Sequence, residues 1–413
     1  MGPILIVGGL FFILGFVTWL NGILITHLKT ACELTNFQAL FVAFAFYISF
    51  TVMALPSSWV LEKIGFKNGM SVGLWVMSLG ALVFIPAAIT RVYPVFLIGL
   101  FILGTGMAIL QTAVNPYITI LGPIESAAKR ISMMGIANKA AGAIAPLVLA
   151  YFIVQPGDDE ALKNLVNLSA QDQQIFLDAW AYRVINPYIV MAVVLFLVGL
   201  GIKYSNLPDI DSEDNDDIQT AGQDDRNSVF SYPYLVLGVI TLFFYVGAEV
   251  IAGDTIIRYG QSLDIPIQTA KMFTTYTMLS MLVGYILGIF LIPKYINQNR
   301  ALQASAIFGV VFTIAALLTQ GYVSVLFIAL LGFANALVWP AIWPLAIKGL
   351  GKHIKTGSAL LIMAISGGAI LSLTWGKLSD IFDSQTAYLI LIPAYLIIFY
   401  YATFGYKITK WKK

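Results

Sequence analysis

Three charged side chains lie within long apolar segments of this chain: Lys139, Glu249 and Asp254. A charge at the centre of a lipid bilayer costs at least ~2.5–3.5 kcal/mol, so such a side chain faces a cavity or a partner. At a rise of ~1.5 Å per helical residue, Glu249 lies about 25 Å along its segment. A carboxylate at that depth can bind a hard cation such as sodium or take up a proton. We therefore predict that Glu249 is a functional group.

The other two charges allow alternatives. Asp254 lies one turn beyond Glu249 and can also be a solvated carboxylate near the membrane interface. Lys139 is either a cation held in a cavity or a structural charge paired with backbone carbonyls. A contact between Lys139 and Glu249 is a further alternative.

Uncharged polar residues are predicted at a similar depth of these segments. They are Asn21, Gln111, Asn115, Asn138 and Asn335. Gln111 and Asn115 are four residues apart, so they share one face of a helix. Amides both donate and accept hydrogen bonds, which suits a ligand covered with hydroxyl groups.

Two tryptophans, Trp339 and Trp343, repeat the spacing of Gln111 and Asn115. An indole can pack on the apolar face of a sugar ring and keep its N–H for a hydroxyl. The alternative is packing against lipid. We predict that at least one of the two contacts a ligand.

These residues are positioned by twelve apolar stretches of about 20 residues or more, the length that crosses a bilayer as a helix. The composition agrees, because 59% of the residues are hydrophobic and only 11% are charged. The sequence predicts an all-α polytopic membrane protein. The predicted helices cover residues 4–28, 37–61, 69–89, 94–121, 131–154, 186–206, 232–257, 269–292, 301–319, 322–347, 356–376 and 385–406.

An internal repeat relates the two halves of the chain. The matched pairs are Gln111 with Trp339, Asn115 with Trp343 and Pro116 with Pro344, each 228 residues apart. We expect Pro116, Pro340 and Pro344 to interrupt their helices. The repeat predicts two six-helix bundles, residues 1–206 and 232–413, joined by an acidic linker, 207–231. Transporters of this plan bind substrate between the halves, near the middle of the membrane.

The distribution of Lys and Arg predicts the orientation. Fifteen of the 23 lie in loops or ends on the side of the two termini, seven lie on the opposite side, and the remaining one is Lys139. Both termini are therefore expected in the cytoplasm. The segment 156–183 on the opposite side is predicted to be a long loop, and we assign it no function.

Several function classes find no support. A net charge of +2 does not indicate a nucleic-acid partner, and the single cysteine, Cys32, cannot form an internal disulfide. His27 and His353 have no other metal-binding residues near them in the sequence and are interpreted as ordinary surface residues. No metal, phosphate-binding or catalytic motif is present, so neither an enzyme nor a bound cofactor is expected.

Four segments carry a resemblance to a known family. They are Leu34-Thr35-Asn36-Phe37-Gln38, the run from Gln111 to Tyr117, the run from Tyr245 to Glu249, and Asn335 to Pro344. On these the chain resembles the major facilitator superfamily. Within it, the chain resembles the glucose/galactose branch of the fucose–galactose–glucose symporter family. The resemblance implies sugar uptake by alternating access, coupled to a cation gradient, in a bacterial inner membrane.

The chain departs from the fucose/proton relative at two positions. Gly22 and Gln111 stand where that relative has acids. The amide that the relative has in the helix matching residues 131–154 is kept here as Asn138. Glu249 matches an acid of the glucose/galactose branch. The resemblance thus favours sodium over protons as the coupling ion and leaves proton coupling open.

The sequence thus predicts a cation-coupled importer of a hexose, acting as a monomer in the lipid bilayer. Asn21, Gln111, Asn115, Asn138, Asn335, Trp339 and Trp343 would hold the sugar. Glu249 would carry the coupling, with Asp254 and Lys139 as further candidates. The alternatives are an uncoupled sugar facilitator and a symporter for fucose, mannose or N-acetylglucosamine.

Overall fold

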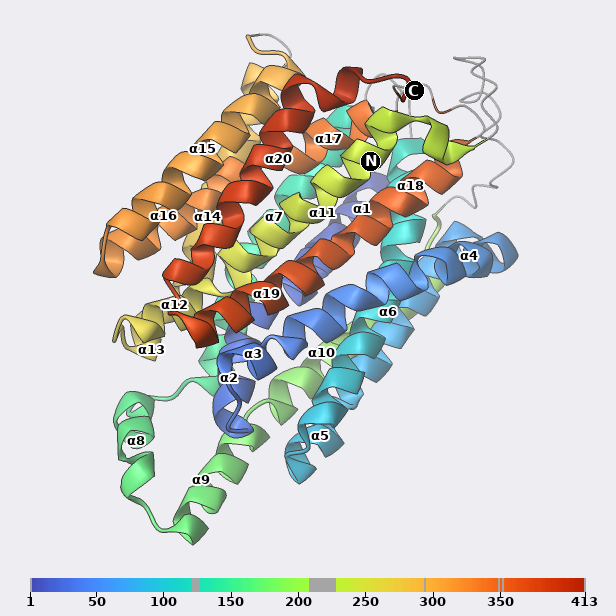
Figure 1. The fold of residues 1–413 in the computed structure, drawn as a ribbon. Helices are drawn as coiled ribbons and strands as arrows, with labels where there is room; N and C mark the ends of the chain where they lie inside the picture. The colour runs from blue at the N-terminus through green and yellow to red at the C-terminus, as the bar shows by residue number, and fades with distance from the viewer. Residues whose placement is uncertain are drawn as a thin grey trace.

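The computed structural model describes residues 2–120, 127–207, 228–292, 295–347, 350 and 353–411. The regular elements in this part of the chain are helical (Figure 1), and twelve helical segments are long and apolar enough to cross a membrane. The predicted all-α polytopic fold is confirmed. The division into bundles of residues 1–206 and 232–413 stays a prediction, and most of the linker 207–231 lies outside the described residues.

The helices of the first half, in chain order, are α1 (Gly2–Thr18), α2 (Asn21–Ala31), α3 (Asn36–Ala39), α4 (Phe41–Leu82), α5 (Phe84–Thr90), α6 (Tyr93–Ile120), α7 (Ala127–Ile153), α8 (Asp158–Asn164), α9 (Ala170–Tyr182) and α10 (Ile185–Tyr204). Those of the second half are α11 (Pro233–Asp254), α12 (Ile256–Ser262), α13 (Ile267–Ala270), α14 (Phe273–Leu291), α15 (Gln298–Leu318), α16 (Gly321–Asn335), α17 (Val338–Ile347), α18 (Ile354–Met363), α19 (Gly367–Ile381) and α20 (Leu391–Thr403). Short 3₁₀ helices cover Leu165–Asn167, Val229–Ser231, Ala364–Ser366, Thr386–Ile390 and Gly405–Lys407.

Both chain termini lie at one end of the molecule, here called the terminal end, and α8 and α9 lie at the other, here called the α9 end (Figure 1). The segment 156–183, predicted as a loop, is largely helical because it contains α8 and α9. The turn predicted between residues 61 and 69 is confirmed as a sharp bend within α4 at Gly65, which has φ 74°, so that α4 contributes to two spans, Asn36–Leu61 and Lys63–Thr90. Glycine adopts this left-handed conformation at little steric cost.

Several predicted spans are broken near the middle or toward one end. α1 stops before Trp19 and Leu20, α11 ends at Asp254, and α16 stops before Ala336. A 3₁₀ helix over Ala364–Ser366 separates α18 from α19. The prediction that Pro116 interrupts its helix is wrong, since α6 continues from Tyr93 to Ile120.

The break between α16 and α17 lies about one turn before Pro340, because a proline cannot donate to the carbonyl four residues earlier. Pro344 likewise leaves the carbonyl of Pro340 without its helical donor. The Gln298 side chain supplies a donor instead, because its Nε2 lies 3.0 Å from the Pro340 oxygen and 2.8 Å from that of Ala341. The carbonyl freed by Pro344 is thus satisfied from α15. The prediction that Pro344 interrupts its helix is wrong, since α17 continues through it to Ile347.

The most extensive helix contacts join α4 with α6 and α10, α1 with α7, α14 with α16, and α15 with α16 and α20. Between the two halves of the chain, α7 packs on α14 and α4 packs on α19. The contact of α1 with α7 is close at Gly15, where an added Cβ would lie 2.0 Å from the backbone oxygen of Asn138.

We expect the substitution Gly15→Ala to lower the melting temperature of the purified protein, because overpacking against backbone costs about 1–3 kcal/mol. Gly9 in the same helix is a matched control, since no atom lies within 4 Å of its added Cβ. Gly9→Ala should leave the melting temperature unchanged or raise it, because alanine favours helix. Equal melting temperatures for both variants would contradict the packing described here.

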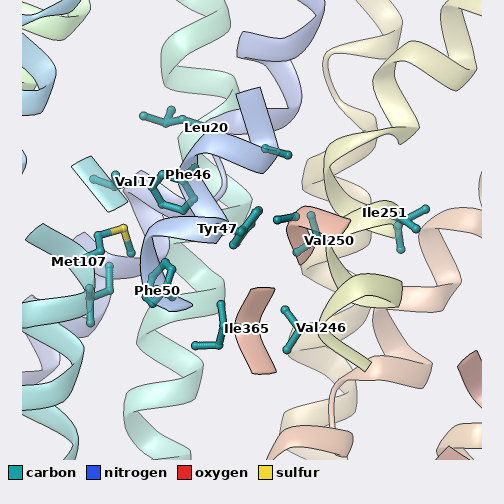
Figure 2. Close-up of a cluster of buried hydrophobic side chains, with 14 of the residues drawn as sticks. Val17, Leu20, Phe46, Tyr47, Phe50, Met107, Val246, Val250, Ile251 and Ile365 are labelled. Carbon is teal, nitrogen blue, oxygen red and sulfur yellow. The ribbon is translucent and has the colours of Figure 1, made fainter. Parts of the chain in front are cut away.

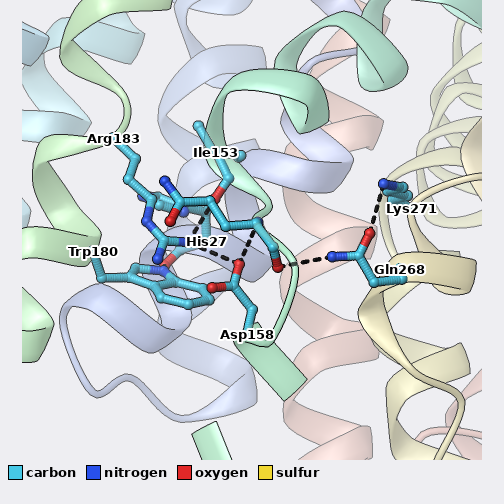
Figure 3. A network of polar contacts seen from close by, with 8 residues as sticks. His27, Ile153, Asp158, Trp180, Arg183, Gln268 and Lys271 are labelled. Carbon is cyan, nitrogen blue, oxygen red and sulfur yellow. Dashed lines mark hydrogen bonds and ion pairs between the residues drawn. The ribbon is translucent and has the colours of Figure 1, made fainter. Parts of the chain in front are cut away.

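The α9 end carries a polar network around Arg183 (Figure 3). Its Nη1 donates to the Asp158 carboxylate at 2.8 Å, and its guanidinium lies over the Trp180 ring. His27 stacks on the same ring at 5.6 Å and is only 3% exposed. The interpretation of His27 as a surface residue is therefore wrong. α9 folds back over the end of α2 and covers it.

Candidate functional site

The central feature of the candidate site is an ion pair between the two halves of the chain. Lys139 of α7 and Glu249 of α11 meet with Nζ and Oε1 2.6 Å apart. Their side chains are 10% and 11% exposed. Of the alternatives for Lys139, the structure shows pairing with the Glu249 carboxylate. Because the partners belong to different halves, this contact joins the two halves in the observed conformation.

Trp19 lies beneath this ion pair, in the break between α1 and α2. The Lys139 Nζ is 4.7 Å from the centroid of its ring. Cβ atoms added to Gly142 of α7 or Gly253 of α11 would come within 2.5 Å of the indole. These two glycines therefore leave the space that the indole occupies. No contact between these glycines and Trp19 was predicted from the sequence.

Asp254, at the carboxyl end of α11, is buried with 0% exposure. Neither of its carboxylate oxygens has a hydrogen-bond partner among the described residues. The alternative of a solvated carboxylate at the interface is thus wrong. Asp254 instead lies against the start of α2, where a Cβ added to Gly22 would be 3.3 Å from the Asp254 Cα.

Two further buried polar groups accompany Asp254. The Asn21 Nδ2 and the Tyr47 hydroxyl have no hydrogen-bond partner in the part of the chain that the structure describes. The Tyr47 hydroxyl lies near the Asn21 amide and within electrostatic reach of Asp254 and Glu249. Figure 2 shows the Tyr47 ring of α4 pointing toward Val250 of α11, across the boundary between the halves.

Tyrosines from three helices of the second half surround the Glu249 side of the site. The hydroxyl of Tyr245 lies beside the Glu249 carboxylate, and that of Tyr285 is within electrostatic reach of it. Tyr395 donates to the Asn335 Oδ1 at 3.1 Å, while the Asn335 Nδ2 has no partner among the described residues. Asn335 is thereby joined to the site through Tyr395, whose hydroxyl lies within electrostatic reach of Glu249.

The remaining predicted sugar ligands are placed less centrally. Gln111 and Asn115 are half-buried in the second half of α6. Trp339 and Trp343 of α17 stack on each other with ring centroids 5.5 Å apart. Asn138 uses its Nδ2 to donate to the Phe11 oxygen at 3.2 Å, and so fastens α7 to α1.

The predicted site residues therefore form two tiers. Glu249 and Asp254 lie toward the α9 end of α11, whereas Gln111 and the two tryptophans lie toward the terminal end (Figure 1). The described contacts bring Asn21, Lys139, Glu249 and Asp254 together. They do not bring Gln111, Trp339 or Trp343 into that group.

A second set of contacts between the halves, here called the Asn36 cluster, lies at the α9 end. The Asn36 Oδ1 accepts from Lys29 Nζ at 2.9 Å and from Arg258 Nη2 at 2.6 Å. The neighbouring Phe37 N–H donates to the Asp380 carboxylate at 2.7 Å. Arg258 and Asp380 belong to the second half, so one short segment before α4 holds both halves together.

Sequence reasoning missed Trp19 and Tyr47 as members of the site, and it used the segment around Asn36 only as a family signature. In the structure a capping box of Thr35 and Gln38 starts α3. No local signal marks Trp19 or Tyr47, because their surroundings are supplied by α7, α11 and α19.

The comparisons with known proteins agree with this architecture. The family model described as Major Facilitator Superfamily matches residues 7–372. A glucose/galactose transporter of Brucella abortus is 33% identical over 401 residues, covering 96% of this chain and 92% of the relative. An L-fucose-proton symporter of Escherichia coli is 29% identical over 407 residues, covering 97% and 92%. The crystal structure of the transporter FucP in the outward conformation superposes with a TM-score of 0.72 at 28% identity, covering 98% of both chains.

Proposed function

The chain belongs to the major facilitator superfamily, and from this premise we propose that it imports a hexose such as glucose or galactose by alternating access. A cation gradient drives the uptake, with sodium favoured over protons. The observation that carries the proposal is the buried group of Lys139, Glu249 and Asp254 at the boundary between the halves. The relatives named as glucose/galactose transporters support the choice of sugar.

The sugar site that we propose comprises the amides of Asn21, Gln111, Asn115, Asn138 and Asn335 and the indoles of Trp339 and Trp343. Amides pair with hydroxyls in both directions, and a stacked indole pair presents an apolar surface to a sugar ring. The Asn21 and Asn335 amide nitrogens are buried donors without a protein partner among the described residues. A hydroxylated ligand would supply the missing acceptors.

The orientation that we propose places both termini in the cytoplasm of a bacterial cell and the α9 end outside. In that orientation the Asn36 cluster closes the outer end of the transport path. The cluster must separate each time the protein opens outward.

Two alternative functions each have an observation in their favour. An uncoupled facilitator is favoured by the absence of acids at Gly22 and Gln111 and by Lys139, whose charge already neutralises Glu249. A symporter for another sugar is favoured by the relatives named as L-fucose-proton symporters.

The test is sugar uptake by the purified protein in proteoliposomes. A sodium gradient is imposed at fixed pH, and a proton gradient is imposed at fixed sodium. Accumulation of sugar above its external concentration in either arm supports the proposal and identifies the ion. Rapid exchange of labelled for unlabelled sugar without accumulation in both arms would instead establish the facilitator.

We expect Gln111→Ala to raise the KM for the sugar about tenfold, because one lost hydrogen bond to the ligand is worth about 1.4 kcal/mol. Gln303→Ala is the matched control, since Gln303 lies in α15 and its Nε2 contacts the Ala402 oxygen at 3.3 Å. The control should have the KM of the unaltered protein. An unchanged KM for Gln111→Ala would remove Gln111 from the proposed sugar site.

A further inference from the structure

Given the proposed symport, on which this inference rests, we infer that Asp254 is the residue that takes up the coupling cation. Asn21 and Tyr47 are its neighbours in the site. Glu249, the stronger candidate from the sequence, has a different role. It forms a neutral ion pair with Lys139 and does not take up the coupling cation.

The charges of the buried group do not balance among the described side chains. Glu249 already has a cation 2.6 Å away in Lys139. Asp254 has 0% exposure and no hydrogen-bond partner for either oxygen among the described residues. An ionised carboxylate so placed is far from stable unless something neutralises it. The group therefore carries one negative charge that the described side chains leave for a proton or a metal cation.

The nearby basic side chains make their hydrogen bonds with groups other than Asp254, and the Arg258 Nε and Nη1 have no partner among the described residues. Lys139 is held by Glu249, and Arg258, four residues after Asp254, donates to Asn36 in the other half. Neither forms an ion pair with Asp254 among the described contacts. The Glu249 carboxylate is itself paired with Lys139, so this ion pair supplies no net positive charge to Asp254.

Elements of both halves of the chain are packed around Asp254. From α14, Thr274 donates to the Gly253 oxygen at 2.8 Å, and from α2, Gly22 lies against the Asp254 backbone. From α4, the Tyr47 hydroxyl is the titratable group that faces it. Hydroxyl, amide and carboxylate oxygens are ligands that hard cations prefer.

The position of Asp254 also supplies a reason for coupling. Gly22, which packs on the Asp254 backbone, and Tyr47, which lies near Asn21 and within electrostatic reach of Asp254, come from the first half of the chain, whereas Asp254 comes from the second. A cation bound among them would be held by both halves in this conformation and by fewer groups after the halves separate. Its binding free energy would then differ between conformations, which is what couples an ion to a conformational change.

The experiment uses full-length protein in proteoliposomes and compares Asp254→Asn with the unaltered protein. We expect Asp254→Asn to exchange labelled for unlabelled sugar but to lose accumulation driven by sodium or by protons. Asp178→Asn is the matched control, since Asp178 is an exposed acid paired with Arg91, and it should accumulate sugar normally. The sodium and proton arms distinguish a bound metal ion from a titrating carboxyl.

Asp254→Glu keeps the carboxylate, and it provides a second test in case Asp254→Asn does not fold. It should accumulate sugar with a changed cation concentration for half-maximal rate, and with an unchanged sugar KM at saturating cation. Normal accumulation by Asp254→Asn, or an unchanged cation dependence of Asp254→Glu, would overturn the assignment while leaving the symport intact. If the unaltered protein exchanges sugar but never accumulates it, the proposed symport and this assignment both fail.

Discussion

Replacing Lys139 with methionine is expected to destabilise the protein more than replacing Lys139 and Glu249 together. The single change leaves the Glu249 carboxylate buried without its partner at 2.6 Å. Removal of one member of a buried ion pair typically costs about 3–5 kcal/mol, whereas replacement of both is often neutral. The order of stability should therefore be unaltered protein and double variant above either single variant.

The measurement is thermal unfolding of the purified variants Lys139→Met, Glu249→Gln and the double variant. Sugar exchange in proteoliposomes is measured in parallel and should recover in the double variant. Lys203→Met is a suitable control, because Lys203 lies near the terminal end of α10, where its Nζ is 5.4 Å from the Trp75 ring centroid. Additive losses in the double variant would show that the two side chains are not energetically coupled.

Asn36→Ala is expected to open the α9 end of the protein. The Asn36 Oδ1 accepts hydrogen bonds from two cations, Lys29 and Arg258. Hydrogen bonds to charged groups are worth about 1.5–3 kcal/mol each. Loss of the bond to Arg258 alone should therefore lower the population of the closed end at least about tenfold relative to the open one.

The single cysteine offers a reporter for this opening. Cys32 lies four residues before Asn36, and burial raises the pKa of its thiol to about 11. Only the thiolate reacts with a maleimide, so the labelling rate should rise about tenfold per pH unit below that pKa. In Asn36→Ala the thiol becomes exposed, its pKa falls toward the ordinary value of 9.0, and labelling near neutral pH becomes faster.

The control for this experiment is Asn299→Ala, which removes an amide at the terminal end that contacts Tyr406. It should label like the unaltered protein at each pH. Equal labelling of the Asn36 variant and this control, over the whole pH range, would show that the Asn36 cluster does not hold the α9 end closed.

The amino-acid sequence alone predicted the twelve spans and the family resemblance. A membrane span is a local property, since about 20 apolar residues must cover the bilayer and bond their own backbone. Lys139, Glu249 and Asp254 were found for the same local reason, because each is a charge in an apolar run. The amides and indoles followed from residue type and helical spacing, and their contact with sugar stays a prediction.

The tertiary structure decided which of these groups meet. Lys139 and Glu249 are 110 residues apart in the chain and pair because α7 and α11 pack across the boundary of the halves. Asp254 changed from an apparent interfacial acid to a buried one because α2 and α14 cover the end of α11. Neither outcome has a signature in the local sequence.

The breaks in the helices were likewise decided by packing. Pro116 is accommodated within α6, whereas the break at Trp19 and Leu20 contains no proline at all. There the indole needs the space left by Gly142 and Gly253, which are far away in the sequence. The sequence by itself determined how many helices cross the membrane and which polar residues they carry. Only the tertiary structure decided which charge is neutralised and which is left for a cation, because a charge is balanced by its neighbours in space rather than along the chain.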